Sequence, residues 1–165
     1  MIGPLTTSPN GFSYVLIMCN LHDKYCRYIP LQKRDARSIA NAIDHEWFLR
    51  LGVPKAILCD NASNLINSCS TLLRDVYGVD LIKLPVRHQS ANGNSERRVR
   101  FFKERLSFYI ETHDFDNGPF DWVTCVPQIE AAQNTCFYPH MASSPFEMRF
   151  GRPLKDPLEN VLEFC

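Results

Sequence analysis

The chain has 165 residues, with 18 Lys and Arg residues balancing 18 Asp and Glu residues, and this length predicts one domain with a sizeable core. Hydrophobic residues make up 45% of the sequence and aromatic residues 12%, a composition that excludes an intrinsically disordered protein. No apolar run approaches the roughly 20 residues that cross a bilayer, and the zero net charge means that any affinity for nucleic acid must depend on local charge.

The first part of the chain predicts a β-hairpin followed by a helix. Residues 12–20 are mostly apolar and follow a Pro-Asn-Gly turn, and a polar turn separates them from a second strand over 25–31. Asp35 is a suitable N-cap for a helix that runs to about Leu51, and the Gly52-Val53-Pro54 sequence ends it.

The middle of the chain alternates short strands with a helix. Residues 55–59 predict a strand that ends at Asp60, and a helix begins at Ser68 or Ser70 and runs to Tyr77. Residues 79–84 predict another strand. Residues 87–94 are polar and lack apolar periodicity, which predicts a loop.

The last part predicts three helices. The first is predicted over residues 94–112, which carry an apolar stripe at helical spacing. Residues 120–137 form the next helix, in which Pro127 predicts a kink or a late start. Ser144-Pro145 opens a short helix over 146–150, which Gly151 ends.

This order of elements predicts an α/β fold with helices on both faces of a sheet. The initial hairpin makes that sheet mixed rather than purely parallel. We expect one domain over residues 1–152 and a C-terminal tail over 153–165.

Seven cysteines are present, and no two have the C-x-x-C spacing. The odd number and the spacing argue against both a disulfide scaffold and a zinc finger. Most lie in apolar segments, where a free cysteine behaves as a small buried hydrophobe. These features indicate a reducing compartment, either the nucleus or the cytoplasm, and residues 1–10 do not resemble a signal peptide.

Two acidic residues are candidates for chemistry. Asp60 follows a buried strand, and ligands of open α/β sheets bind at the carboxyl ends of strands. Glu96 opens the long helix. The structural alternatives are a helix cap or Asx turn for Asp60 and a favourable helix-dipole interaction for Glu96.

Basic residues crowd the start of the same helix. Glu96, Arg100 and Lys103 share one helix face, and a carboxylate beside two cations suits a phosphodiester ligand. The alternative is a solvated basic face. Asn92-Gly93 could act as a flexible joint and His88 as a phosphate contact or acid–base group, or they could be an ordinary turn and an exposed side chain. The basic residues of this cluster are Arg97, Arg98, Arg100, Lys103 and Arg105.

Four stretches taken in order resemble the integrase catalytic core of retroviruses and long-terminal-repeat retrotransposons, and among these the gypsy-like elements most. The most specific point is the spacing: 35 residues lie between Asp60 and Glu96, as between the second and third acids of the D,D-35-E triad of that family. The stretches are I-G-P-L at 2–5, V-P-K-A-I-L-C-D-N at 53–61, H-Q-S-A-N-G-N-S-E-R at 88–97, and a broken fourth comprising Asn134, Pro139-His140, Ser144-Pro145-Phe146-Glu147 and Gly151-Arg152.

The resemblance implies a ribonuclease-H-like fold, with a five-stranded mixed sheet flanked by helices. It implies that Asp60 and Glu96 bind Mg²⁺ or Mn²⁺ for two-metal phosphoryl transfer in DNA end processing and strand transfer. It places Arg100 and Lys103 on element-end DNA and Asn92-Gly93 in a flexible catalytic loop. Neighbouring His88 and Arg97 are further candidates for DNA contact. The implied partners are element ends, target DNA and other copies of the chain, with no membrane partner.

The chain also departs from the family pattern. The first acid of the family would fall just ahead of Met1, which would leave the first strand truncated, and Asp23 is expected to be an exposed turn residue rather than a substitute. With two acids we expect impaired catalysis in this chain. The alternative function is that of a non-catalytic DNA-binding or interaction protein derived from an integrase.

Overall fold

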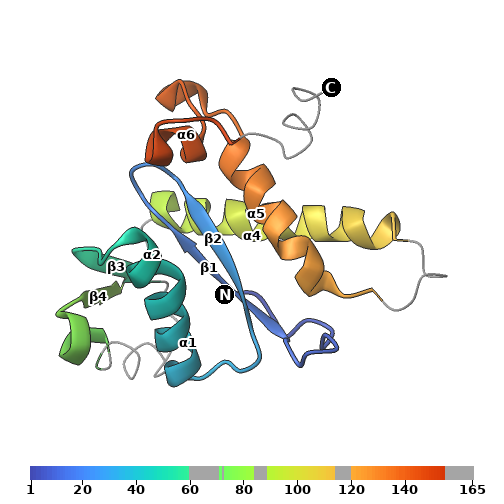
Figure 1. The fold of residues 1–165 in the computed structure, drawn as a ribbon, viewed down its shortest axis with the longest axis horizontal. Helices are drawn as coiled ribbons and strands as arrows, with labels where there is room; N and C mark the ends of the chain where they lie inside the picture. Colours follow the sequence, from blue (N-terminus) through green and yellow to red (C-terminus); the bar gives the residue numbers. More distant parts are fainter. Residues whose placement is uncertain (60–70, 72, 84–88, 114–119, 155–165) are drawn as a thin grey trace, which may run out of the picture.

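The computed structural model describes residues 1–59, 71, 73–83, 89–113 and 120–154 (Figure 1). At its centre lies an antiparallel hairpin of β1 (Tyr14–Cys19) and β2 (Cys26–Leu31). Ile2 forms an isolated antiparallel bridge with Val15, and Val15 pairs with Pro30 on its other side. Both predicted strands and their hairpin connection are confirmed.

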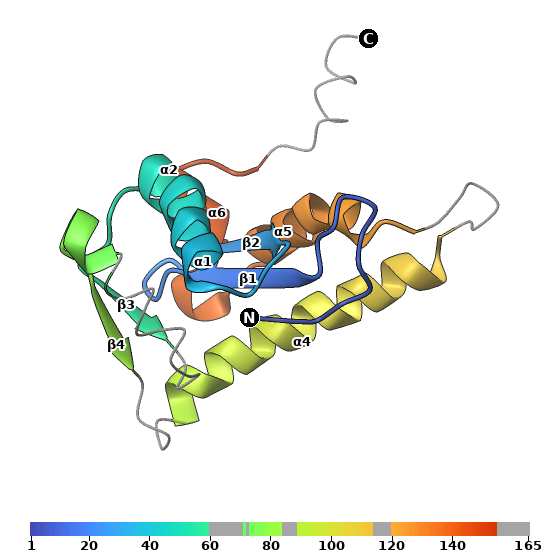
Figure 2. The same ribbon diagram turned by 90° about the horizontal axis from the view of Figure 1, so that it is seen from below.

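Helices cover both faces of the hairpin, because side chains along a strand alternate between its two faces. On one face Leu16 and Ile29 pack in a core cluster with α1 (Ala36–Ile43) and the π-helical turn η1 (Asp44–Phe48). On the other face Val15 and Tyr28 pack in a second cluster with α4 (Gln89–Glu111) and α5 (Val126–Thr135). Figure 2 shows α1 on one side of the hairpin and α4 on the other. The prediction that helices pack on both faces of a sheet is therefore confirmed for this hairpin.

The first helical region has the expected ends. The carboxylate of Asp35 accepts a hydrogen bond from the Ser38 backbone N–H at 2.9 Å, so Asp35 is the N-cap of α1. The helix continues through η1 into α2 (Leu49–Leu51) and ends at Gly52, whose φ of 91° favours glycine.

A second, parallel sheet consists of β3 (Ala56–Cys59) and β4 (Asp80–Lys83). The helical segment 73–77 lies between them in the chain, and Leu73 belongs to the core cluster of α1. The beginning of this helix, expected at Ser68 or Ser70, lies outside the described residues. Within the described ranges the strands form two separate two-stranded sheets, so the five-stranded sheet implied by the resemblance is not observed there.

Helix α4 begins earlier than its sequence predicts. Residues 89–93 were expected to be loop, but the helix begins at Gln89. The loop prediction was wrong, because the polar residues 89–93 are helical although they lack apolar periodicity. Although α4 has 23 residues, no helix in the described part of the chain is both long and apolar enough to cross a membrane.

The C-terminal helices follow their sequence signals. A 3₁₀ turn η3 (Trp122–Cys125) precedes α5, and Pro127 lies in the first turn of α5, which confirms the predicted late start. After η4 (Pro139–Met141), helix α6 (Pro145–Phe150) begins with a capping box between Ser144 and Glu147. Gly151 ends it with a φ of 69°.

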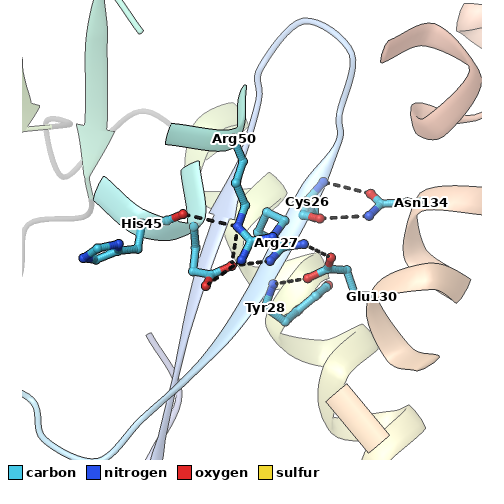
Figure 3. Close-up of polar contacts among 8 residues, drawn as sticks. Cys26, Arg27, Tyr28, His45, Arg50, Glu130 and Asn134 are labelled. Carbon is cyan, nitrogen blue, oxygen red and sulfur yellow. Dashed lines mark hydrogen bonds and ion pairs between the residues drawn. The ribbon is translucent and has the colours of Figure 1, made fainter. Parts of the chain in front are cut away.

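Polar side chains connect the hairpin to the helices on both sides (Figure 3). Arg27 forms ion pairs with Glu46 of η1 at 2.5 Å and with Glu130 of α5 at 2.8 Å. Glu130 also accepts a hydrogen bond from the Tyr28 backbone N–H at 2.8 Å. The network fixes the position of β2 between η1 and α5.

Candidate functional site

Two of the predicted site residues, Asp60 and His88, lie outside the described residues. Strand β3 ends at Cys59, so Asp60 directly follows a strand in the chain, as expected. The approach of Asp60 to Glu96 therefore stays a prediction.

The described part of the site is an exposed face on the N-terminal half of α4. Glu96, Arg97, Arg100 and Lys103 are all exposed. The first three of these and Gly93 line a surface hollow of about 460 Å³. The hollow therefore combines one carboxylate with two guanidinium groups.

Asn92 and Gly93 belong to this helix and not to the flexible loop in which the resemblance placed them. The Gly93 carbonyl accepts a hydrogen bond from Arg97 Nε at 3.1 Å. A Cβ on Gly93 would meet nothing within 4 Å, so the glycine is not required there by a close backbone approach. Contact of either residue with DNA remains a prediction.

On this face Arg100 forms a long, exposed ion pair with Glu104 of the same helix. Arg100 Nε lies 3.8 Å from Glu104 Oε1, and the two side chains are 71% and 67% exposed. Such surface pairs contribute little to stability. Because α4 begins at Gln89, the cations on this face lie beyond the first turn, where the helix dipole has little effect. A phosphate group bound at this face would relieve their mutual repulsion.

Arg98 does not belong to the exposed basic face, contrary to the sequence prediction. It is only 8% exposed, and its Nε donates a hydrogen bond to Cys26 Sγ at 2.8 Å. Arg98 lies one helical turn before Phe102, which is fully buried against the hairpin. The position of Arg98 on the helix therefore directs it inward. Arg105 lies further along, with its guanidinium 5.4 Å from the centre of the Phe101 ring.

The cluster of Cys19, Cys26 and Arg98 was not anticipated from the sequence. A hydrogen bond to Cys26 and then burial raise the pKa of the Cys19 thiol. Burial raises the pKa of Cys26, but the Cys19 hydrogen bond and the Arg98 charge outweigh burial and hold that pKa below its ordinary value. The expected hairpin could have predicted that the two cysteines are close, because Cys19 and Cys26 lie opposite each other across its turn.

Several residues of the fourth motif have structural roles. Asn134 is buried and hydrogen-bonds to both the N–H and the carbonyl of Cys26, each at 2.8 Å (Figure 3). Ser144 and Glu147 cap α6, and the hydrogen bonds from Ser144 hold the pKa of Glu147 below its ordinary value. These residues support the fold, and the structure assigns them no place in the α4 hollow.

The expectation that Asp23 is exposed was wrong. Asp23 is 7% exposed, its carboxylate lies 2.6 Å from Arg149 Nη1, and it accepts a hydrogen bond from the Tyr25 N–H at 2.9 Å. Helix α6 covers the hairpin turn that contains Asp23, and so Arg149 of α6 lies against the Asp23 carboxylate. Asp23 thus stabilises the contact between the hairpin turn and α6.

The described residues supply one carboxylate of the predicted metal site. Glu96 provides the hard oxygen donor that Mg²⁺ prefers. No group of three or more His, Cys, Asp or Glu residues that could hold a metal occurs among the residues with described positions. The donor type fits a divalent cation, and the binding of such a cation by Glu96 together with Asp60 stays a prediction.

Sequence comparisons relate the chain to Pol polyproteins. It is 31% identical over 155 residues to the retrovirus-related Pol polyprotein from transposon 412 of Drosophila melanogaster, covering 92% of this chain and 12% of that protein. It is 26% identical over 144 residues to the Gag-Pol polyprotein of feline leukemia virus, covering 87% of this chain and 8% of that protein. The chain thus spans a small fraction of these relatives. No protein-family model matches it.

Structure comparisons identify the fold. The HTLV-2 integrase catalytic core domain in complex with magnesium superposes with a TM-score of 0.61 at 13% identity, covering 82% of this chain and 83% of that chain. The BIV integrase catalytic core domain superposes with a TM-score of 0.59 at 15% identity, covering 92% of this chain and 90% of that chain. The sequence relatives and the shared fold together confirm the resemblance to the integrase catalytic core of retroviruses and retrotransposons.

Proposed function

We propose that this chain is a retroelement integrase-type core that binds DNA and contributes acidic residues to metal-dependent phosphoryl transfer during DNA integration. The observation that supports the proposal most is the position of Glu96, whose carboxylate shares an exposed hollow with Arg97 and Arg100. A carboxylate and two cations in one hollow complement a phosphodiester and its bound cation.

In this proposal the residues of α4 have separate roles. Arg100 and Lys103 bind backbone phosphates of element-end DNA, and Arg97, with Asn92, Gly93 and His88, contributes further contacts to the strand. Asp60 and Glu96 hold Mg²⁺ or Mn²⁺, and such ions, when bound, stabilise the charge that develops on the attacked phosphate. Positioning and charge neutralisation by protein side chains provide most of the remaining catalysis in such reactions.

The proposed partners are element ends, target DNA and further copies of the chain. Two structural relatives support these partners: the HTLV-2 core was solved in a trimeric form with magnesium, and the simian T-cell lymphotropic virus relative is an intasome. The latter has a TM-score of 0.58 at 12% identity and covers 85% of this chain and 50% of that chain. We place the protein in the nucleus or cytoplasm.

DNA binding measured as a function of salt tests the basic face. The double variant Arg100→Gln/Lys103→Gln should bind duplex DNA more weakly. The slope of log affinity against log salt should fall by about 2, since each phosphate contact contributes about 0.9. The matched control Lys33→Gln/Arg37→Gln removes the same charge from exposed positions around the start of α1, and it should change the slope little. Equal slopes for the two double variants would refute the assignment.

Metal dependence tests the acidic residues in the same assay. In wild type, Mn²⁺ should increase DNA affinity, and Glu96→Gln should remove that increase while leaving metal-free binding intact. If wild type and Glu96→Gln both bind DNA without metal and Mn²⁺ changes the affinity of neither, the result would favour the alternative, a non-catalytic DNA-binding protein. DNA affinity is the chosen readout because it reports metal binding and phosphate contact without requiring turnover.

A further inference from the structure

Cys19 and Cys26 are directly opposite each other in the β1–β2 hairpin. The next pair towards the turn is hydrogen-bonded, because the Asn20 N–H donates to the Tyr25 carbonyl at 2.9 Å. The Cys26 N–H and carbonyl point away from β1 and bind Asn134. Cys19 and Cys26 therefore occupy a non-hydrogen-bonded position, where opposite Cα atoms are about 4.5 Å apart. This separation lies within the range that disulfides span.

The two thiol groups also converge on the same atoms. The Lys24 carbonyl oxygen accepts a hydrogen bond from Cys19 Sγ at 3.5 Å and from Cys26 Sγ at 3.2 Å. Both side chains thus point to the hairpin face that packs on α4. Cys26 is fully buried and Cys19 is partly exposed, so the pair can be reached from one side.

A cation faces the buried sulfur. Arg98 Nε donates to Cys26 Sγ at 2.8 Å from the inner face of α4. An adjacent guanidinium favours the thiolate, which is the nucleophilic form of cysteine. Cys136, by comparison, is exposed at the C-cap position just after α5, and its Sγ donates a hydrogen bond to the Ala132 carbonyl at 3.1 Å. It offers a control thiol in the same chain.

We propose that Cys19 and Cys26 form a redox-sensitive dithiol that closes to a cross-strand disulfide when the protein meets a peroxide. The Cys26 thiolate attacks one peroxide oxygen, the O–O bond breaks, and the departing hydroxide is protonated to water. Cys19 sulfur then attacks the Cys26 sulfenic sulfur, the S–O bond breaks, and the second hydroxide takes the Cys19 proton to form water. Two thiols are oxidised and one peroxide is reduced to two waters.

Closure would change the contact between the hairpin and α4. A disulfide sulfur carries no negative charge, so Arg98 loses the charge-assisted part of its interaction with Cys26. Arg98 lies on the helix that carries Glu96 and Arg100. Oxidation therefore should loosen α4 against the hairpin. The inference does not depend on the proposed integrase function.

The experiment compares the full chain before and after hydrogen peroxide, with remaining thiols alkylated before non-reducing trypsin digestion. Trypsin cleaves after Lys24 and Arg27, so Cys19 and Cys26 fall in separate peptides, 1–24 and 25–27. Oxidised wild type should yield these peptides linked and two hydrogens lighter than their sum, and a reductant should separate them. Recovery of both peptides alkylated after peroxide, or linkage of either to another cysteine, would overturn the proposal.

Variants and hydrogen exchange extend the test. Cys19→Ser should abolish the linked species, whereas Cys136→Ser should retain it. Because the wild-type digest decides the question alone, a misfolded variant does not leave it open. Amide hydrogen exchange over residues 93–105 should be faster in oxidised than in reduced wild type. Unchanged exchange would refute the coupling to α4.

Discussion

Asn134 shows how a single side chain can complete the hydrogen bonding of a strand. Cys26 occupies a position of β2 whose N–H and carbonyl point away from β1. A buried backbone group without a partner is costly, and the Asn134 amide provides one donor and one acceptor at the required spacing. Its role is to fasten α5 to the hairpin, and the same contact orients the strand that carries the Cys26 thiol.

The Asn134→Ala variant should be less stable than wild type by roughly 2–4 kcal/mol, because a buried N–H and a buried carbonyl both lose their partner. Urea unfolding followed by circular dichroism measures the difference. Asn41→Ala is the matched control, since Asn41 is exposed on α1, and its effect should stay within about 0.5 kcal/mol. Equal stability of the two variants would contradict the role assigned to Asn134.

At the scale of the element, the start of α4 determines how the site is presented. Because the helix begins at Gln89, Gly93 lies inside it, and Glu96 and Arg97 lie one turn further along the same helix. Glycine inside a helix is less favourable than alanine, since it loses more backbone freedom on folding. The helical position of Asn92 and Gly93 differs from the flexible loop implied by the resemblance, whereas Glu96 lies on the helix as expected.

Gly93→Ala should stabilise the protein by about 1 kcal/mol, because the backbone is helical and the added Cβ meets open space. At this chain length the midpoint of thermal unfolding should rise by about 2–4 °C. The contrasting variant is Gly78→Ala, where a φ of +67° disfavours a side chain and the midpoint should fall. A decrease with Gly93→Ala would instead indicate that the chain needs a non-helical conformation at this position.

Local signals predicted most of the elements, and long-range contacts account for what was missed. The Asp35 cap, the position of Pro127 and the Ser144 capping box each act within a few residues, so a sequence pattern is sufficient to locate them. The inward position of Arg98 and the burial of Asp23 depend on partners 72 and 126 residues away. No local pattern contains that information, and the arrangement of strands into sheets has the same long-range character.

At the scale of the whole molecule, Arg27 joins three layers of the fold. Its guanidinium lies between Glu46 of η1 and Glu130 of α5, and its side chain is 23% exposed. Burial raises the pKa of Glu130, although the Tyr28 N–H and Arg27 act in the opposite direction. Because the folded pKa of Glu130 is raised, the native state binds more protons above the ordinary value of 4.5, and stability falls as pH rises through that window.

Arg27→Met removes one of the groups that lower the Glu130 pKa, so the folded pKa should rise further and the window of lost stability should widen. The destabilisation should therefore be small near pH 4, where Glu130 is protonated, and reach about 1–3 kcal/mol at pH 7, where Glu130 is ionised and lacks its partner. Arg50→Met is the matched control. Arg50 also pairs with Glu46, at 3.3 Å, but is 59% exposed, so its loss should cost less than about 1 kcal/mol. Urea unfolding of both variants at the two pH values measures the effect, and a cost of Arg27→Met that is independent of pH would show that packing, and not the ion pairs, accounts for its role.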